Sequence, residues 1–103
     1  KLKERRVSLM FGVLYETPHE LLKEIPGLIK RAVEGEEGAR IDRVHLAAYG
    51  PSSIDFELVY YALTDDYTLH MDIKERILLA IKEAFDEKGI EFAYPTQTLY
   101  VKK

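Results

Sequence analysis

The chain has 103 residues, of which 47% are hydrophobic and 32% are charged, and its formal net charge is -3. That length suits one globular domain with a modest core, and the negative charge argues against a nucleic-acid partner, because nucleic-acid-binding domains usually carry a basic patch. The chain contains no cysteine, which excludes disulfides and thiolate metal sites, and no apolar run reaches the about 18 residues of a membrane-spanning helix.

The first part of the chain predicts a strand followed by a helix. The side chains of residues 5–15 alternate between the two faces of a predicted strand. Both faces are substantially apolar, so we expect this strand to be central in a sheet. The run Thr17-Pro18-His19-Glu20 matches a capping box with proline at the first helical position, which predicts a helix over residues 18–33. Pro26 falls inside this helix and lacks a backbone donor, so we predict a kink or break there.

A hairpin is predicted next, with strands over residues 41–49 and 53–63 joined at Gly50. Its register follows from keeping the apolar side chains on one face, because a slip of one residue would move charges into the core. The expected core-side pairs are Leu46 with Phe56, Val44 with Leu58 and Ala48 with Ile54, and His45 is expected to face Glu57 on the other side.

The last part of the chain predicts a helix and a short strand. Asp66 or Thr68 is expected to cap the helix, and its apolar stripe recurs at helical spacing from Ile73 to Phe85. Gly89 supplies the left-handed residue that ends it. Residues 90–94 are apolar, aromatic and too few for a helix, so we predict a fourth strand that ends at the following proline.

The order strand, helix, strand, strand, helix, strand predicts an α+β, ferredoxin-like βαββαβ sandwich, with an antiparallel four-stranded sheet and two helices on one face. We expect this ferredoxin-like α/β domain over residues 1–95 and a C-terminal extended tail over residues 96–103. No strand is left in the chain to pair with the tail, so we predict an inter-subunit tail strand. Its strand-forming residues are Thr98, Leu99, Tyr100 and Val101.

The sheet face opposite the helices is predicted to carry many apolar side chains, and contiguous apolar patches usually mark interfaces. A slightly apolar surface of a monomer is the alternative explanation. Tyr49 is placed on this open face, whereas Leu79 is a single exposed leucine on a charged helix face and proves nothing alone. The residues predicted at an interface are Met10, Leu14, Val59, Tyr61, Leu63 and Leu79.

We find no constellation of residues for catalysis or cofactor binding. His19, His45 and His70 lack the spacing of metal ligands, and Asp65-Asp66 is far more typical of a helix cap than of a catalytic pair. Nucleophile, P-loop and dinucleotide motifs are missing as well. We therefore expect no enzymatic activity, no metal and no cofactor.

Three segments carry a pattern of a known family: RRVSLMFGVLYET at residues 5–17, YGPSSIDFELVYYAL at residues 49–63 and MDIKERILLAIKEAFDEKGIEFAYPTQTLYV at residues 71–101. The last is the most specific, since it passes from a helix through glycine to a short strand and a proline. Together these segments resemble the cytoplasmic C-terminal domain of the small-conductance mechanosensitive ion channels, the MscS family. Ala93 and Thr96 differ from the best-known members, which suggests a different branch.

The resemblance implies a non-catalytic cage domain of a homoheptameric channel in the cell (inner) membrane. This domain is expected on the cytoplasmic side, without direct membrane contact, after membrane helices and a small β domain. It would help to enclose a vestibule for ions and osmolytes, and its tail would join a parallel barrel. Because the sequence begins at Lys1 without methionine, we likewise expect a piece of a longer polypeptide.

A second hypothesis is a small-molecule-binding regulatory module with the same ferredoxin-like (ACT-like) fold. Such a module should carry a glycine-rich ligand loop where a strand meets a helix. The junctions after Tyr15 and Asp65 offer helix caps rather than such a loop, so the sequence favours the channel domain.

Overall fold

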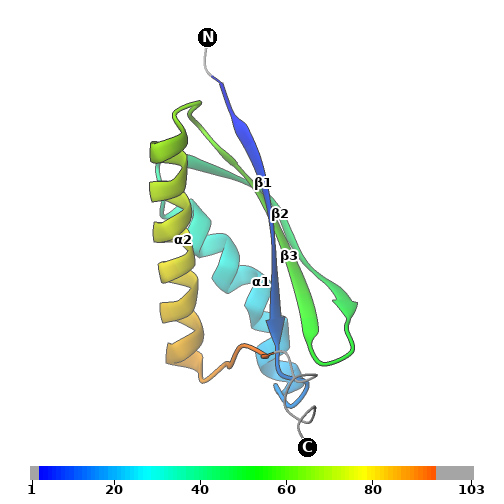
Figure 1. Ribbon diagram of the computed structural model, residues 1–103. Coiled ribbons are helices and arrows are strands. Elements are labelled where there is room, and N and C mark those ends of the chain that lie inside the picture. The colour runs from blue at the N-terminus through cyan, green and yellow to red at the C-terminus, as the bar shows by residue number, and fades with distance from the viewer. Residues whose placement is uncertain (1–2, 95–103) are drawn as a thin grey trace, which may run out of the picture.

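The computed structural model describes residues 3–94, which form three strands and two helices (Figure 1). The elements in chain order are β1 (Arg5–Val13), α1 (His19–Glu34), β2 (Ala39–Tyr49), β3 (Ile54–Ala62) and α2 (Tyr67–Lys88). Both helices lie on the same face of one antiparallel sheet. The chain therefore has the two-layer α+β architecture that its sequence patterns predict.

The strand order in the sheet is β1-β3-β2, so β3 is central and β1 lies at an edge. Within residues 3–94 the first strand is thus not central as predicted, because its other side carries a single bridge, from Val13 to Phe92. Most of β3 is buried, whereas only Val13 is fully enclosed along β1. Apolar residues on both faces suggested a central strand, but one of them, Met10, is 57% exposed, and single exposed apolar side chains are common on protein surfaces.

The fourth strand predicted over residues 90–94 is reduced to a single bridge between Val13 and Phe92. One backbone hydrogen bond lies on each side of this bridge, at 3.3 and 2.8 Å. The sheet of the described residues thus has three strands, not the predicted four. Side-chain packing holds this segment more than pairing does, because the Phe92 ring centroid lies 4.9 Å from that of Phe85 in a stacked arrangement.

The hydrophobic core fills the space between the helices and the sheet. Along α2, Ile73, Ile77, Ile81 and Phe85 recur at four-residue intervals and are buried. Burying each such side chain fully stabilises the fold by about 1.5–3 kcal/mol. The inward-facing residues of β3 complete the core from the other layer: Ile54, Phe56, Leu58, Tyr60 and Ala62.

The start and middle of α1 differ from the prediction. Pro18 is the N-cap and makes no side-chain hydrogen bond there, while the Thr17 hydroxyl donates to the Leu14 carbonyl oxygen at 2.7 Å. The predicted capping box is therefore not formed. The helix also runs uninterrupted through Pro26, so the predicted break does not occur. Proline removes one backbone donor, and the buried side chains around it hold the helix on the sheet.

Both ends of α2 confirm the prediction. The Asp66 carboxylate caps the first turn by accepting a hydrogen bond from the Leu69 N–H at 3.3 Å. At the other end Gly89 has a φ of 73°, in the left-handed region. The Ile90 N–H then donates to the Phe85 carbonyl oxygen at 2.9 Å, which closes the last turn.

The predicted hairpin register is confirmed in the middle of the strands and wrong near the turn. The confirmed pairs are Leu46–Phe56, Val44–Leu58 and His45–Glu57. A bulge at Ala47 then shifts the pairing by one residue, so that Tyr49 and not Ala48 lies opposite Ile54. Tyr49 therefore belongs to the helix side of the sheet and not to the open face where the sequence pattern placed it. A second bulge occurs at Asp42.

Two polar side-chain atoms are buried without a hydrogen-bond partner among residues 3–94: the Tyr60 hydroxyl and Nδ1 of His70. Burial raises the pKa of Tyr60 to about 12. Burial also lowers the pKa of His70, and the positive charges of Arg5 and Lys74 lower it further. The folded state thus favours the neutral form of His70.

This preference predicts a stability that falls as the pH drops below about 6.5, the usual pKa of histidine. Below that value the unfolded chain binds a proton at His70 that the folded chain resists, so acidification shifts the equilibrium toward unfolding. We expect urea unfolding of the wild type to show lower stability at pH 5.5 than at pH 7.5. The variant His70→Gln, which cannot titrate, should show a smaller difference; an equal difference would contradict this role of His70.

Candidate functional site

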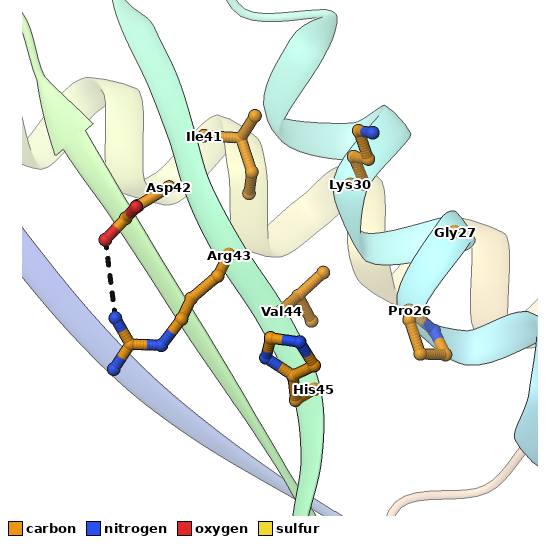
Figure 2. A pocket seen from close by; sticks show the side chains of 8 residues that line it. All are labelled: Pro26, Gly27, Lys30, Ile41, Asp42, Arg43, Val44 and His45. Atoms are coloured by element: carbon orange, nitrogen blue, oxygen red, sulfur yellow. Dashed lines mark hydrogen bonds and ion pairs between the residues drawn. The ribbon is translucent and has the colours of Figure 1, made fainter.

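A surface groove of about 410 Å³ lies between α1 and the edge strand β2 (Figure 2). The half-buried Ile41 and Val44 contribute apolar surface from the strand and also pack against the core. One turn of α1 forms the opposite wall. The residues that line the groove are Pro26, Gly27 and Lys30 from α1 and Ile41, Asp42, Arg43, Val44 and His45 from β2.

The groove is built from irregular positions in both elements. Pro26 and Gly27 are consecutive interior residues of α1, and in a helix interior they are less favourable than alanine by about 3 and 1 kcal/mol, respectively. The bulge at Asp42 lies on the opposite wall, and bulges at sheet edges commonly redirect side chains toward sites. The residues that shape this groove therefore stabilise the fold less than a regular helix and a regular strand would at the same positions.

The charges at the groove are mainly positive. Arg43 is held by Asp42 at 3.4 Å and by Glu57 at 3.7 Å, whereas Lys30 makes no ion pair with any residue between 3 and 94. No pair of carboxylates and no nucleophile beside a base lines the groove. Its apolar side chains and its charged rim fit binding of another surface.

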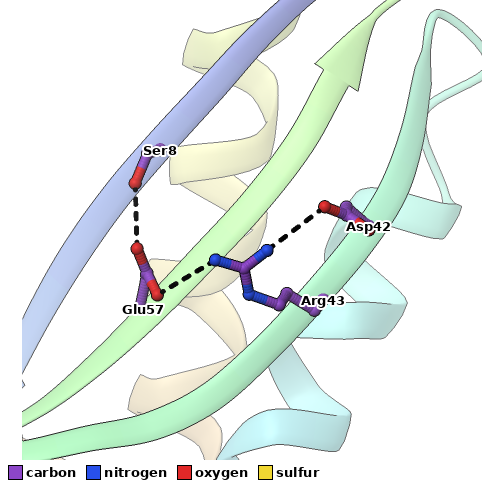
Figure 3. Close-up of polar contacts among 4 residues, drawn as sticks. All are labelled: Ser8, Asp42, Arg43 and Glu57. Carbon is purple, nitrogen blue, oxygen red and sulfur yellow. Dashed lines mark hydrogen bonds and ion pairs between the residues drawn. The ribbon is translucent and has the colours of Figure 1, made fainter.

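The open face of the sheet carries a polar network across all three strands (Figure 3). The Ser8 hydroxyl of β1 donates to the Glu57 carboxylate of β3 at 3.3 Å. Glu57 in turn pairs with Arg43 of β2, which also contacts the neighbouring Asp42. This face is therefore less apolar than the sequence pattern suggested.

The predicted interface residues of the sheet lie in different environments. Met10 is exposed, whereas Val59 is fully buried although it points toward the open face. Tyr61 is half-buried beneath Arg40, whose guanidinium lies 4.5 Å from the ring centroid. Leu14 and Leu63 are half-buried at the ends of the strands. Among the predicted interface residues on the sheet, Met10 is therefore the main exposed apolar side chain.

The outer face of α2 carries an apolar stripe, of which only Leu79 was predicted from the sequence. That residue is 61% exposed, and Leu78 next to it, Met71 and Tyr67 are exposed as well. The spacing of seven and eight residues from Met71 to Leu78 and Leu79 is about two helical turns and places them on the same side of α2, and this was the missed signal. Together with Asp72, Lys74 and Glu75, Met71, Leu78 and Leu79 line a shallow groove of about 500 Å³.

The structure brings no chemistry-bearing residues together elsewhere in the described part. His19 begins α1, His45 lies on β2 and His70 lies on α2. Between residues 3 and 94 no group of three or more His, Cys, Asp or Glu side chains is placed to hold a metal ion, and neither helix is long and apolar enough to cross a membrane. The predicted tail residues Thr98–Val101 lie outside the described residues.

Comparison with known proteins gives a consistent result. The family model described as "Mechanosensitive ion channel MscS, C-terminal" matches residues 7–92. The chain is 35% identical over 100 residues to the small-conductance mechanosensitive channel MscMJ of Methanocaldococcus jannaschii, covering 96% of this chain and 29% of that protein. It is 34% identical over 103 residues to the large-conductance channel MscMJLR of the same organism, covering 95% and 28%.

A solved structure is similar as well. The crystal structure of Helicobacter pylori MscS in its closed state superposes with a TM-score of 0.61 at 26% sequence identity. The match covers 88% of this chain and 35% of that one. The present chain therefore spans less than a third of the length of its curated relatives and about a third of the similar solved chain.

The space around two glycines, Gly27 in the wall of the groove and Gly38 outside it, predicts opposite effects of their substitution. At Gly27 an added Cβ would meet only the flexible end of Arg31, 3.4 Å away, so Gly27→Ala should stabilise the chain by up to about 1 kcal/mol through helix propensity. At Gly38 the added Cβ would lie 2.7 Å from Cδ1 of the buried Ile73, so Gly38→Ala should destabilise it by about 1–3 kcal/mol. Urea unfolding measures both changes. A destabilised Gly27→Ala variant would show that the wall of the groove is needed for folding itself.

Proposed function

The chain belongs to the MscS family of mechanosensitive ion channels, and from this membership we propose that it is a non-catalytic domain on the cytoplasmic side of a tension-gated channel. The observation that carries the proposal is the match of residues 7–92 to the C-terminal domain of the family. The relatives are more than three times as long as this chain. In the proposal, the remainder of such a polypeptide supplies the membrane-spanning part.

We further propose that the domain works by assembly with identical copies, as a wall of a vestibule through which ions and osmolytes pass. The heptamer that the family resemblance implies is the proposed oligomer. Two surfaces support this role, the α1–β2 groove and the apolar stripe of α2, since a monomer gains nothing from exposing them. On the open sheet face, Met10 is the residue best exposed for a further contact.

The fold within the assembly is proposed to be ferredoxin-like, with residues 1–95 as the domain and residues 96–103 as its tail. The bridge between Val13 and Phe92 supports this, because it places the last described segment beside β1, the position of a fourth strand in that topology. We propose that the tail pairs with the tails of neighbouring copies, since parallel copies around an axis can close into a barrel.

A regulatory module that binds a small molecule is a weaker explanation. Small-molecule sites are usually deep, with a few convergent polar groups. Within residues 3–94 the α1–β2 groove is a surface feature whose arginine is already occupied by Asp42 and Glu57. The comparisons with known proteins likewise name channels.

The proposed function is tested by expressing the full-length polypeptide that carries this chain in a bacterial strain without its own mechanosensitive channels. We expect the cells to survive a sudden dilution of the medium that kills the parent strain. Membrane patches should show currents that open with suction. Patches that stay silent up to the tension at which they rupture, from cells with the protein in the membrane, would contradict the proposal.

Deleting residues 96–103 separates assembly from folding. If the tail pairs with neighbouring copies, the deletion should leave the melting temperature of the isolated domain nearly unchanged, because the tail contributes little to its own core. The same deletion should lower the stability of the full-length oligomer, measured as the temperature at which it dissociates in detergent. Unfolding of the isolated domain after this deletion would instead make the tail a strand of its own sheet.

A further inference from the structure

We propose that, in the assembly, the outer stripe of α2 in one copy docks into the α1–β2 groove of the next copy. This inference rests on the proposed homo-oligomer and specifies which two surfaces meet in it. The occupant of the groove is thus a second copy of this chain, and the contact joins two different patches on each subunit.

The two patches belong to elements that lie toward opposite sides of the sheet. The groove belongs to β2, which forms one edge of the sheet, and α1 packs over that strand. Helix α2, which carries the stripe, lies toward β1, the outer strand on the other side of the three-stranded sheet: at the start of α2 the Arg5 guanidinium lies 5.5 Å from the Tyr67 ring centroid. At the end of α2, Phe85 stacks on Phe92, which is bridged to β1. Patches on opposite sides allow each copy to contact one neighbour on either side.

The patches also match in apolar character. Met71, Leu78 and Leu79 are exposed apolar side chains on the outer face of α2, around a shallow hollow. The α1–β2 groove offers Ile41 and Val44 between its walls. Ridges of helical side chains pack well into grooves of this kind. The lack of a side chain at Gly27 keeps the wall of the groove low, which lets a neighbouring helix approach.

Charge complementarity favours this pairing over the pairing of two α2 stripes. The stripe is flanked by two acidic residues and one lysine, Asp72, Glu75 and Lys74, so its formal charge is negative. The groove is lined by Lys30, Arg43 and Asp42, so its formal charge is positive. Within residues 3–94, neither Lys30 nor Glu75 has an ion-pair partner, so both are available to a neighbour. Complementary charges across an interface fix its register more than they raise its affinity.

The sequence of the groove gives independent support. Proline and glycine inside α1 and a bulge in β2 all reduce local regularity, and all of them fall on the residues that line this one groove. Native sequences break local rules mainly at sites where function compensates for the loss. A contact between two different patches also leaves each copy with one free patch for the next, which a ring of more than two copies requires.

Cysteine cross-linking tests the contact, since the chain has no cysteine of its own. Lys30→Cys and Leu79→Cys are introduced at exposed positions of the full-length polypeptide, after any cysteine outside the chain is replaced by serine. Upon oxidation in membranes, the double variant should give a ladder of products beyond the dimer, and each single variant should stay monomeric on a denaturing gel. Dimers from Leu79→Cys alone would mean that two α2 stripes meet, and would overturn the proposal.

The mass of the purified polypeptide separates the possible failures. A monomer would contradict the proposed assembly together with this contact. An oligomer of unchanged mass that gives no ladder would contradict this contact alone and leave the proposed function standing.

Charge reversal gives a second readout. Lys30→Glu or Glu75→Lys should raise the fraction of monomer in mild detergent by about three- to tenfold, the range expected for a surface ion pair turned into a repulsion. The double reversal should restore the oligomer. Glu87→Lys, the same change at an exposed position of α2 two turns beyond Leu79, is the control and should have no effect. Equal effects of Glu75→Lys and Glu87→Lys would count against the proposal.

Discussion

The burial of β3 beneath two helices is the interaction on which the rest of the structure depends. Phe56, Leu58 and Tyr60 are fully buried on its inner face, and β1 and β2 pair with it on either side. This arrangement satisfies the central strand and leaves β2 as an edge, whereas the end of β1 is bridged to Phe92. The edge of β2, together with α1 above it, remains available for contact, so this surface of the domain follows from the position of β3.

Sequence patterns predicted the parts of the fold that burial controls. The inner hairpin pairs were correct because a slip would have buried charge, and the ends of α2 were correct because Asp66 and Gly89 have specific roles in helix capping. The two bulges of β2 could not be predicted in this way, since an edge strand tolerates an extra residue without disturbing the core. The central position of β3 depends on its pairing with β1, a strand that is far from it in the sequence.

The candidate site was only partly accessible from sequence. Leu79 was recognised, but the stripe that it forms with Met71 and Leu78 was missed, because each residue alone is an ordinary exposed side chain. Pro26 was recognised as irregular, but its position on the wall of a groove emerges only when α1 lies against β2. Pro26, Gly27 and the bulge at Asp42 reduce the stability of a single chain. The proposed contact with another copy at this surface gives a reason for their presence there.

The most direct test of this account is the structure of the full-length assembly, determined by electron cryomicroscopy in a lipid nanodisc. The account predicts a closed ring of identical copies in which the stripe of α2 in each copy contacts the α1–β2 groove of its neighbour. Lys30 and Glu75 of adjacent copies should then lie within the distance of an ion pair. A ring in which both surfaces face solvent, or in which two α2 stripes face each other, would contradict it.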